Sequence, residues 1–416
     1  MNIMLHKKIC KIGRIIDKTF ENLTYKSAIV HNLKLNRMYK NAILNITNFM
    51  KLNSAYWIWE VMMKKRIFLT FTVVLLAVIG GCGTKTSNPA LENASNDIEM
   101  TQTPIETAIP EEEIMKTRSY PDNAYQIMDK DYTNNDWAPF GTVVSFPYET
   151  KNHQTEDDTI YQKSALVYLP ACYDANDTDT KYNVLYLMHG GSDSPQWFLG
   201  KEGGCSQITR MLDSMIEKGE IEPLIICAVS YYTDYCGDAT RNCLDFHYEL
   251  MNDVIPLFET TYHTYAEDVT KEGLAASRQH RAFGGFSMGA VTTWSVLENC
   301  IDEFAYFLPI SGDCWTLGST MGGSKPYETA VQLAFKIGEA GKTSSDFYIY
   351  SGCGEYDMAE PNLTPQIEGM KKLTDTFIYC DNFADGNLYQ CIYPGGGHDV
   401  NTVIAILYNG LPKMFD

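Results

Sequence analysis

The sequence contains no zinc-binding motif and no internal repeat, and most of it is poor in basic residues. Its twelve cysteines include no C-x-x-C pair, and their spacings do not suggest a zinc site. After residue 82 the chain is poor in basic residues, since residues 83–416 hold 20 Lys and Arg against 49 Asp and Glu. A surface this acidic repels phosphate backbones, so we do not expect nucleic acid as a partner.

The first hundred residues also lack an apolar run long enough to cross a membrane comfortably. The run from Ile67 to Ile79 has thirteen residues, which is typical of a signal-peptide core, and a basic segment at 63–66 precedes it. It ends in Ile79-Gly80-Gly81-Cys82, which resembles a bacterial lipobox whose cysteine becomes the lipidated first residue. We therefore predict a lipoprotein signal peptide over residues 62–82, with a transmembrane anchor as the alternative.

Both interpretations place the C-terminal part of the chain outside the cytoplasm. We expect an extracellular, cell-surface lipoprotein that touches the membrane only through a lipid on Cys82. Residues 1–61 are predicted to be an upstream extension from a mis-assigned start codon, or alternatively a basic cytoplasmic tail. Residues 83–123 are rich in Thr, Ser, Asn, Pro and Glu, which predicts a flexible stalk. The folded domain is then expected to span residues 124–416.

Export would permit disulfide bonds, and two pairs of cysteines are close enough in sequence to consider. Cys236 and Cys243 lie in one loop-like stretch, and Cys380 and Cys391 flank a turn-like segment. Either pair could form a bridge, whereas an anaerobic source would leave all four thiols reduced. For most of the other cysteines we expect a role as small buried hydrophobic residues.

From about residue 124 onward, strand-like and helix-like patterns alternate along the chain. Helical spacing appears over 248–262 and again over 288–297. This alternation predicts an α/β fold with a mostly parallel sheet and helices on both faces, in which ligands bind beyond the carboxyl ends of the strands. The expected strands cover residues 164–169, 183–188, 223–229, 281–286, 305–310, 347–350 and 388–393.

The strongest chemical signal is the G-x-S-x-G sequence at 285–289, between a strand pattern and a helix pattern. A tight strand-to-helix turn forces the serine into a strained conformation, and the flanking glycines avoid the clash of side chains there. The hydroxyl then projects from the sheet, at a helix N-terminus that favours developing negative charge. We predict Ser287 as a catalytic nucleophile.

A serine nucleophile needs a base, and the base needs an acid partner. His398 follows a strand pattern within a glycine-rich loop, which would carry its ring over the sheet edge. Asp357 follows the 347–350 strand, giving the chain order Ser, Asp, His that α/β-hydrolases have. Glu355 and Asp399 are rival carboxylates, although Asp399 adjoins the histidine and is poorly placed to orient its ring.

The negative charge that develops on the substrate oxygen needs two prepared N–H donors. One is expected from the backbone of Met288, directly after the nucleophile. The other should come from the loop that follows the strand at 183–188, where glycine lets the backbone approach the substrate closely. Gly191 and Ser192 are the candidates. This chemistry needs no metal and no organic cofactor.

These motifs together resemble carbohydrate esterase family 1, the esterase D-like group that includes feruloyl esterases and acetyl xylan esterases. The resemblance spans roughly residues 160–412, implies an α/β-hydrolase fold, and assigns the triad of that family to Ser287, Asp357 and His398. Ala290 departs from it, because many relatives have a third glycine there. The matching pieces are 186–191, Trp197, 249–250, 253–256, Arg278, 285–289, 311–312 and 396–399.

Aromatic residues in the predicted loops at the same edge suggest the substrate. Trp197, Trp315, Tyr231 and Tyr232 could stack on a phenolic acid or a sugar ring. We predict a feruloyl esterase that releases hydroxycinnamic acids from plant arabinoxylan, so its partner is a cell-wall polysaccharide or a small ester. An acetyl xylan esterase is the close alternative, and a tethered glycan-binding protein without activity is the alternative of another class.

Overall fold

The computed structural model describes residue 120 and residues 122–415. The predicted extension at 1–61, the signal peptide at 62–82 with Cys82, and the stalk up to residue 119 lie outside the described residues. Among the helices of the described part, none has both the length and the apolar composition that a membrane crossing requires.

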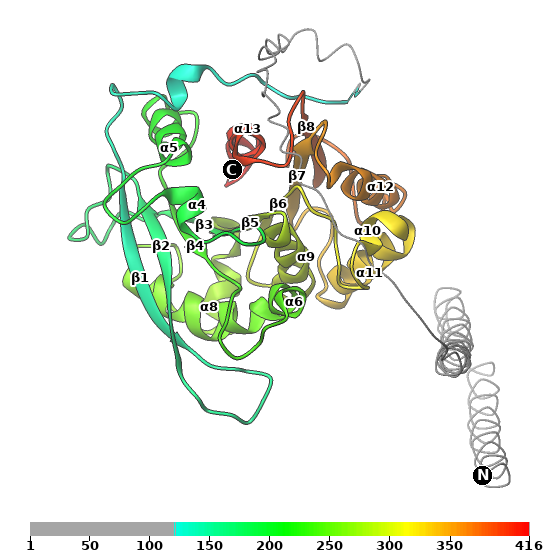
Figure 1. Ribbon diagram of the computed structural model, residues 1–416, viewed down its shortest axis with the longest axis horizontal. Helices are drawn as coiled ribbons and strands as arrows, with labels where there is room; N and C mark the ends of the chain where they lie inside the picture. Colours follow the sequence, from blue (N-terminus) through cyan, green and yellow to red (C-terminus); the bar gives the residue numbers. More distant parts are fainter. Residues whose placement is uncertain (1–119, 121, 416) are drawn as a thin grey trace, which may run out of the picture. The chain divides into compact units, whose positions relative to one another are not determined.

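An eight-stranded sheet forms the centre of the described part (Figure 1). Its strands lie in the order β1-β2-β4-β3-β5-β6-β7-β8, with β1 and β2 antiparallel to their neighbours and the remaining strands parallel. The prediction of a mostly parallel sheet is thus confirmed. The strands are β1 (Thr142–Thr150), β2 (Tyr161–Leu169), β3 (Asn183–Met188), β4 (Leu224–Val229), β5 (Arg281–Phe286), β6 (Tyr306–Ile310), β7 (Tyr348–Gly354) and β8 (Leu388–Tyr393).

Helices cover both faces of this sheet, as predicted (Figure 1). Helices α4, α5 and α13 bury apolar side chains against one face, and α6, α7, α9, α11 and α12 against the other. The helices are α4 (Gln196–Leu199), α5 (Gln207–Glu217), α6 (Ala239–Glu249), α7 (Ile255–Thr261), α8 (Lys271–Ala276), α9 (Met288–Cys300), α10 (Met321–Ser324), α11 (Pro326–Glu339), α12 (Glu360–Met370) and α13 (Val400–Gly410). Shorter helical turns are η1 (Lys130–Tyr132), η2 (Leu250–Val254), η3 (Arg278–His280) and η4 (Leu411–Lys413).

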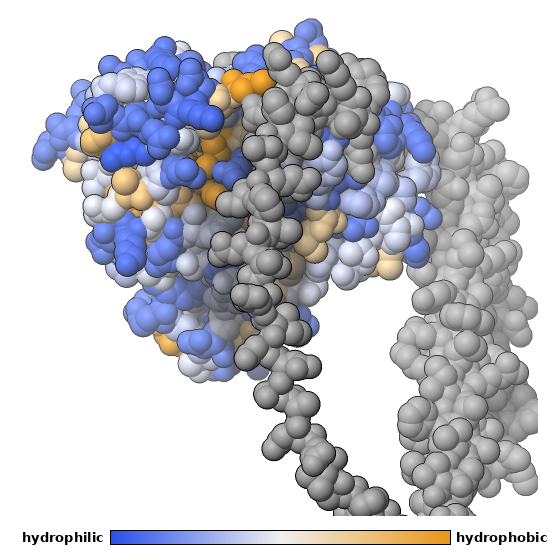
Figure 2. All heavy atoms as spheres, turned by 45° about the horizontal axis from the view of Figure 1, so that its top comes forward, coloured by the Kyte–Doolittle hydropathy of each residue, from blue (hydrophilic) through white to orange (hydrophobic). Residues whose placement is uncertain are grey.

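The central strands are continuous apolar runs because helices cover them on both sides. Strands β3 to β6 are buried along their whole length, which is typical of parallel strands. The outer surface is different: the face shown in Figure 2 is mostly hydrophilic, with smaller hydrophobic areas between. The buried sheet is therefore a rigid support for the loops that follow its strands.

The helix predicted over 248–262 is present but not uniform. Helix α6 passes into the π-helical turn η2, and α7 then begins at Ile255 with Pro256 in its first turn. Proline fits a first helical turn because its missing N–H would have no partner there. The π-turn marks the position where the helical path is adjusted to accept it.

The chain already contacts the sheet before residue 124. The side chain of Asn123 donates a hydrogen bond to the Ile392 carbonyl (2.8 Å) and accepts one from the Ile392 N–H (3.1 Å). The hydroxyl of Tyr389 donates to the carbonyl of Asp122 (2.8 Å). These contacts attach the segment at 122–123 to strand β8, so this short segment belongs with the folded part.

Candidate active site

Ser287 occupies a strained turn between strand β5 and helix α9. Its φ of 57° and ψ of −114° are backbone angles that a residue with a side chain rarely adopts. The surrounding backbone is too close for side chains at the flanking glycines. A Cβ on Gly285 would lie 2.5 Å from the carbonyl of Gly289, and one on Gly289 would lie 2.0 Å from the Met188 oxygen. The G-x-S-x-G spacing is therefore a packing requirement of this turn.

A continuous hydrogen-bonded chain links Ser287, His398 and Asp357. The Ser287 hydroxyl lies 2.9 Å from Nε2 of His398, and Nδ1 of His398 lies 2.7 Å from Oδ1 of Asp357. The Asp357 side chain is fully buried, whereas that of His398 is 23% exposed. A carboxylate only accepts hydrogen bonds, so Nδ1 carries the proton and Nε2 is left to accept from the serine.

Two loops at the carboxyl edge of the sheet hold the histidine and the aspartate together. Asp357 follows strand β7, and His398 follows strand β8. The backbone N–H of Tyr356 donates to the Gly396 carbonyl (2.8 Å), and the side chain of Glu355 accepts from the Gly395 N–H (3.1 Å). These cross-links fix the separation of the two loops.

The hydrogen-bond partners of the three candidate carboxylates show which of them contacts His398. Glu355 is buried and bonds the backbone of the histidine loop at Gly395. Asp399 is the N-cap of helix α13, and its Oδ1 accepts from the backbone N–H groups of Asn401 (2.8 Å) and Thr402 (3.2 Å). Only Asp357, of these three, bonds the imidazole.

The loop after strand β3 is braced by buried polar groups. The Gly190 carbonyl accepts a hydrogen bond from Nδ1 of His189 (2.8 Å) and another from the Tyr231 hydroxyl (3.1 Å). Burial lowers the pKa of His189 to about 4, so its ring is neutral near pH 7 and its Nε2 accepts from Ser230 (2.8 Å). Within a trans peptide the N–H points away from the C=O, so this brace also sets the direction of the Gly191 N–H.

This geometry distinguishes between the two predicted donors of the loop. The N–H of Ser192 donates to the hydroxyl of Tyr232 (2.7 Å), so it is already engaged. Gly191 instead lines the pocket above Ser287. Of the two alternatives, the Ser192 prediction is corrected and Gly191 remains, beside the backbone N–H of Met288.

A pocket of about 370 Å³ opens over the Ser287 hydroxyl. The ring of Trp197 stacks on Phe286 with a centroid separation of 5.0 Å and an interplanar angle of 9°. Phe286 in turn packs 4.5 Å from the His398 ring. The pocket is lined by Gly191, Asp193, Trp197, Phe286, Ser287, His398, Asp399 and Val400.

The four aromatic residues predicted to bind substrate have different environments. Trp197 lines the pocket over Ser287. Tyr231 is only 1% exposed, and Tyr232 bonds Ser192, so both support the loop after β3. Trp315 is partly buried against the core and donates to Asp313 (2.8 Å), and it is not among the residues that line this pocket. The prediction for Tyr231 is corrected, because its ring is buried in the core, whereas the role of Trp315 stays a prediction.

Three pocket residues were not expected from the sequence: Asp193, Phe286 and Val400. Each lies within two residues of a recognised motif residue, and that adjacency is the signal that could have found them. Burial raises the pKa of Asp193, and the nearby His398 offsets only part of this rise. Asp193 and Asp399 place carboxylates around the entrance, which favours a neutral ligand over an anion.

The cysteine pairs considered for disulfides are not bridged. All ten cysteines within residues 122–415 are free thiols. Cys243 is buried in the core, and Cys391 lies inside strand β8, where burial raises the pKa of its thiol to about 12. In this part of the chain no cluster of three His, Cys, Asp or Glu side chains could hold a metal ion.

Comparison with known proteins identifies relatives of this domain, although no family model matches the chain. Endo-1,4-beta-xylanase Y of Acetivibrio thermocellus is 39% identical over 253 residues, which is 61% of this chain. The matched part spans only 22% of that relative. The similarity thus concerns one part of a much larger enzyme.

Solved structures match along nearly their whole length. The feruloyl esterase module of Clostridium thermocellum, a serine-to-alanine mutant complexed with sinapinate, is 36% identical with a TM-score of 0.61. The match covers 72% of this chain and 96% of that one. The ferulic acid esterase of Anaeromyces mucronatus is 18% identical with a TM-score of 0.52, covering 70% and 98%, and supports the fold alone. The fold is thus the α/β-hydrolase fold, and the chain belongs to carbohydrate esterase family 1 and is a serine esterase.

Proposed function

We propose that this chain is a feruloyl esterase that releases hydroxycinnamic acids from plant arabinoxylan. The observation that carries the proposal is the hydrogen-bonded chain of Ser287, His398 and Asp357, which opens into a pocket walled by a stacked pair of aromatic rings. The esterase module that is 36% identical was solved with sinapinate, itself a hydroxycinnamate.

In the first half of the reaction the substrate acylates the enzyme. His398 Nε2 takes the proton of the Ser287 hydroxyl as the serine oxygen attacks the ester carbonyl. The N–H groups of Met288 and Gly191 receive the negative charge of the tetrahedral intermediate. The intermediate collapses when its bond to the sugar oxygen breaks, and His398 returns the proton to that oxygen. The sugar leaves as an alcohol and the acid remains bound to Ser287.

In the second half water replaces the sugar. His398 takes a proton from water, whose oxygen attacks the acyl carbonyl, and the same two N–H groups bind the oxyanion. The bond to Ser287 breaks, the serine oxygen regains its proton, and the free acid departs. Throughout, Asp357 holds the tautomer of the ring and stabilises its positive form. The released acid is an anion, so Asp193 and Asp399 at the entrance favour its departure.

The size and shape of the pocket favour an aromatic acid over an acetyl group. A volume of about 370 Å³ greatly exceeds the room that an acetyl group needs. Trp197 forms part of the pocket wall, and one face of its ring packs against Phe286. A planar ring that stacks in this way gains apolar contact and about 0.5–1.5 kcal/mol beyond burial. We infer that the cinnamoyl ring packs beside Trp197 while its carboxyl carbon reaches Ser287.

The test compares four ester substrates of the purified chain: methyl ferulate, a chromogenic acetate, cereal bran and acetylated xylan. We expect turnover of methyl ferulate with a higher kcat/KM than a chromogenic acetate, and release of ferulic acid from cereal bran. The Ser287→Ala variant is the control and should lose several orders of magnitude in rate. Acetate release from acetylated xylan without ferulate release would support an acetyl xylan esterase. Failure to turn over any of these esters would favour a binding protein.

We also propose that the chain is held at the outer cell surface by a lipid on Cys82. The support is the basic segment, the short apolar run and the lipobox-like ending at residues 62–82. Residues 83–119 would then span the distance between the lipid and the esterase domain. Metabolic labelling with a radioactive fatty acid should mark the wild-type chain and leave Cys82→Ser unlabelled. Labelling of both would disprove this attachment.

A further inference from the structure

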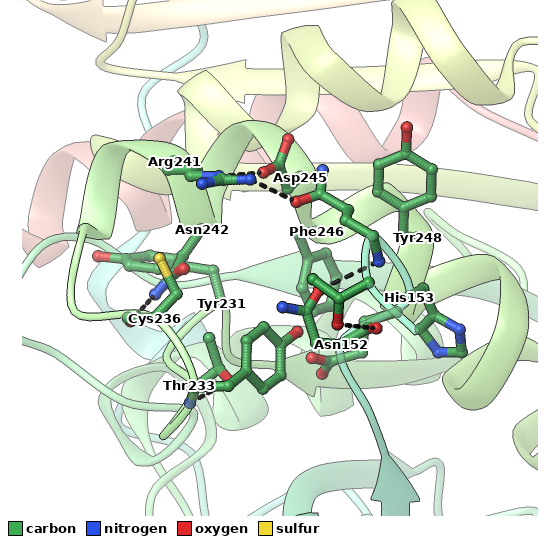
Figure 3. A pocket seen from close by; sticks show the side chains of 14 residues that line it. Asn152, His153, Tyr231, Thr233, Cys236, Arg241, Asn242, Asp245, Phe246 and Tyr248 are labelled. Carbon is green, nitrogen blue, oxygen red and sulfur yellow. Dashed lines mark hydrogen bonds and ion pairs between the residues drawn. The ribbon is translucent and has the colours of Figure 1, made fainter. Parts of the chain in front are cut away.

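A second pocket lies at the carboxyl edge of the sheet, outside the catalytic pocket (Figure 3). Three segments form it: the tip of the β1–β2 hairpin at 151–160, the loop after strand β4 at 230–238, and helix α6. Its volume of about 140 Å³ equals the share of roughly five water molecules, at about 30 Å³ each, which is room for a small ring.

Planar polar side chains line this pocket. Arg241 on α6 bonds Asp245 through Nε (3.1 Å) and Gln154 of the hairpin through Nη2 (3.0 Å). Figure 3 shows Arg241 and Tyr248 toward opposite ends of the hollow with Asp245 between them, and Asn152 of the hairpin lies below. Amide, carboxylate and guanidinium groups offer paired donors and acceptors, which suit ligands with neighbouring hydroxyl groups.

The lysine and arginine in and beneath the pocket are paired with carboxylates. Arg241 contacts Asp245 (3.1 Å) and Lys163 contacts Glu249 (2.6 Å), and His153 lies 2.6 Å from Asp253. Neither of these two cations is left to hold an anion, so a neutral, hydroxyl-rich ligand fits best.

An aromatic surface completes the pocket. Tyr248 lines it and is 41% exposed, and Tyr235 and Phe246 line it from below the rim. A sugar ring has an apolar face, and stacking on an exposed aromatic side chain is an ordinary way to bind that face. Polar groups for hydroxyls and an aromatic face for the ring thus occur together.

The position of the pocket matches the position of a polymeric substrate. Tyr231 lies between the two sites: its ring lines this pocket, and its hydroxyl bonds Gly190 beside the catalytic pocket. The pocket follows strand β4 and Ser287 follows β5, with β3 between them. Two strand spacings amount to roughly 10 Å. An ester-linked sugar leaving the catalytic pocket toward this side would bring its neighbours in the polymer to the second pocket.

We propose that this pocket is a subsite that binds a sugar residue of the polysaccharide carrying the ester. The proposal rests on the proposed function, because it assumes that the ester is attached to a glycan. It names residues that select for the polymer, whereas the catalytic pocket selects for the acid. Tyr248, Arg241 and Gln154 are the residues expected to contact the sugar.

The test compares a feruloylated arabinoxylan oligosaccharide with methyl ferulate as substrates of the full chain. Tyr248→Ala should lower the ratio of their kcat/KM values about tenfold, chiefly through KM for the oligosaccharide. Gln154→Ala, which changes a hairpin side chain, should lower the ratio in the same direction. Tyr327→Ala is the matched control, because Tyr327 on α11 is 50% exposed and is not among the residues that line the pocket. It should leave the ratio unchanged.

A binding measurement separates this inference from the proposed function. Unesterified arabinoxylan oligosaccharide should bind the wild-type chain in calorimetry and bind Tyr248→Ala about tenfold more weakly, whether or not ferulate is released. Binding without ferulate release would overturn the proposed function and retain the subsite. Ferulate release with an unchanged ratio in both Tyr248→Ala and Gln154→Ala would overturn the subsite and retain the function.

Discussion

The two ends of strand β5 hold polar side chains under opposite conditions. Arg281 begins the strand, is 2% exposed, and has its guanidinium bonded to Glu259 (2.6 Å) and to the carbonyls of Leu274 and Glu303. Ser287 follows the strand, is partly exposed, and has strained backbone angles. At the buried end, each nitrogen of the Arg281 guanidinium has a hydrogen-bond partner, so this side chain can only stabilise the fold. The exposed end keeps a reactive hydroxyl at the cost of local strain.

The strongest test of this comparison is a substitution that removes the backbone strain at Ser287. Ser287→Gly should remove roughly 10⁶-fold of kcat, because the triad acts as a unit. It should also raise the free energy of unfolding by about 1 kcal/mol, because glycine adopts a φ of 57° without a Cβ clash. Ser287→Ala is the matched control: it loses the same activity but keeps the strain. Equal stability of the two variants by chemical denaturation would refute the argument.

The next largest effect concerns the carboxylate that orients His398. Asp357→Asn should lower kcat about 10⁴-fold, because the amide favours the wrong tautomer and leaves the positive ring unsupported. Asp399→Asn keeps the helix cap, since asparagine caps as well as aspartate, and should change kcat only a few-fold. Steady-state kinetics on methyl ferulate decide between these carboxylates. A larger loss in Asp399→Asn would reverse the assignment.

At the saturated end of β5 we expect an effect on stability alone. Glu259→Gln should lower the free energy of unfolding by about 3–5 kcal/mol, because it leaves the buried Arg281 charge without its counter-charge. The kcat of the folded fraction should stay at the wild-type value. Glu339→Gln, which breaks an exposed pair with Lys336, should change stability by less than about 0.5 kcal/mol. Thermal unfolding and active-site titration would measure both quantities.

The pH dependence of stability tests the neutral state of His189. Its pKa is about 4 in the folded chain, below the ordinary value of about 6.5 in the unfolded chain. The unfolded chain therefore binds this proton first, and stability falls as the pH drops from about 6.5 to about 4, by roughly 3 kcal/mol from this group. His189→Asn should show a correspondingly shallower loss between these pH values. An identical slope in both chains would contradict a neutral, buried ring.

The smallest effect separates support from chemistry at the functional edge. Tyr231→Phe removes one of the two donors on the Gly190 carbonyl, which is worth about 1 kcal/mol. We expect kcat for methyl ferulate to fall about fivefold with little change in KM, because the loop binds the transition state more than the substrate. Tyr161→Phe at the start of β2 serves as the control and should leave kcat unchanged. A change in KM alone would mean that Tyr231 touches the substrate.

The fold was the predictable part of this molecule, and the turn that carries Ser287 also has a clear signal in the sequence. Buried parallel strands such as β3 and β4 are mostly apolar runs, and the turn around Ser287 requires glycines at fixed positions, so both leave a local pattern in the sequence. Strand β1 was not predicted, and Pro147 within it is a residue that usually argues against a strand. The proline is accepted here because β1 lies at the edge of the sheet.

The supporting contacts were not predictable, because they depend on packing between segments far apart in the chain. Nothing near Tyr231 in the sequence shows that its hydroxyl reaches Gly190, or that core packing hides its ring. The hydrogen-bond partners of the rival carboxylates were equally hard to predict from the sequence. The sequence disfavoured Asp399 through its position next to His398, but the backbone contacts of Glu355 and the bond of Asp357 to the imidazole came from the structure.

Tyr231 links the second pocket to the loop that prepares the oxyanion donor, and this link should affect turnover. One side of this residue faces the second pocket, and its hydroxyl steadies the peptide that prepares the Gly191 N–H for the oxyanion. A polymer that fills the second pocket presses on the residues that bury this ring, and so restrains the same peptide that the reaction depends on. Chain length of the substrate should therefore influence the speed of ester cleavage itself, in addition to how tightly the polymer is held.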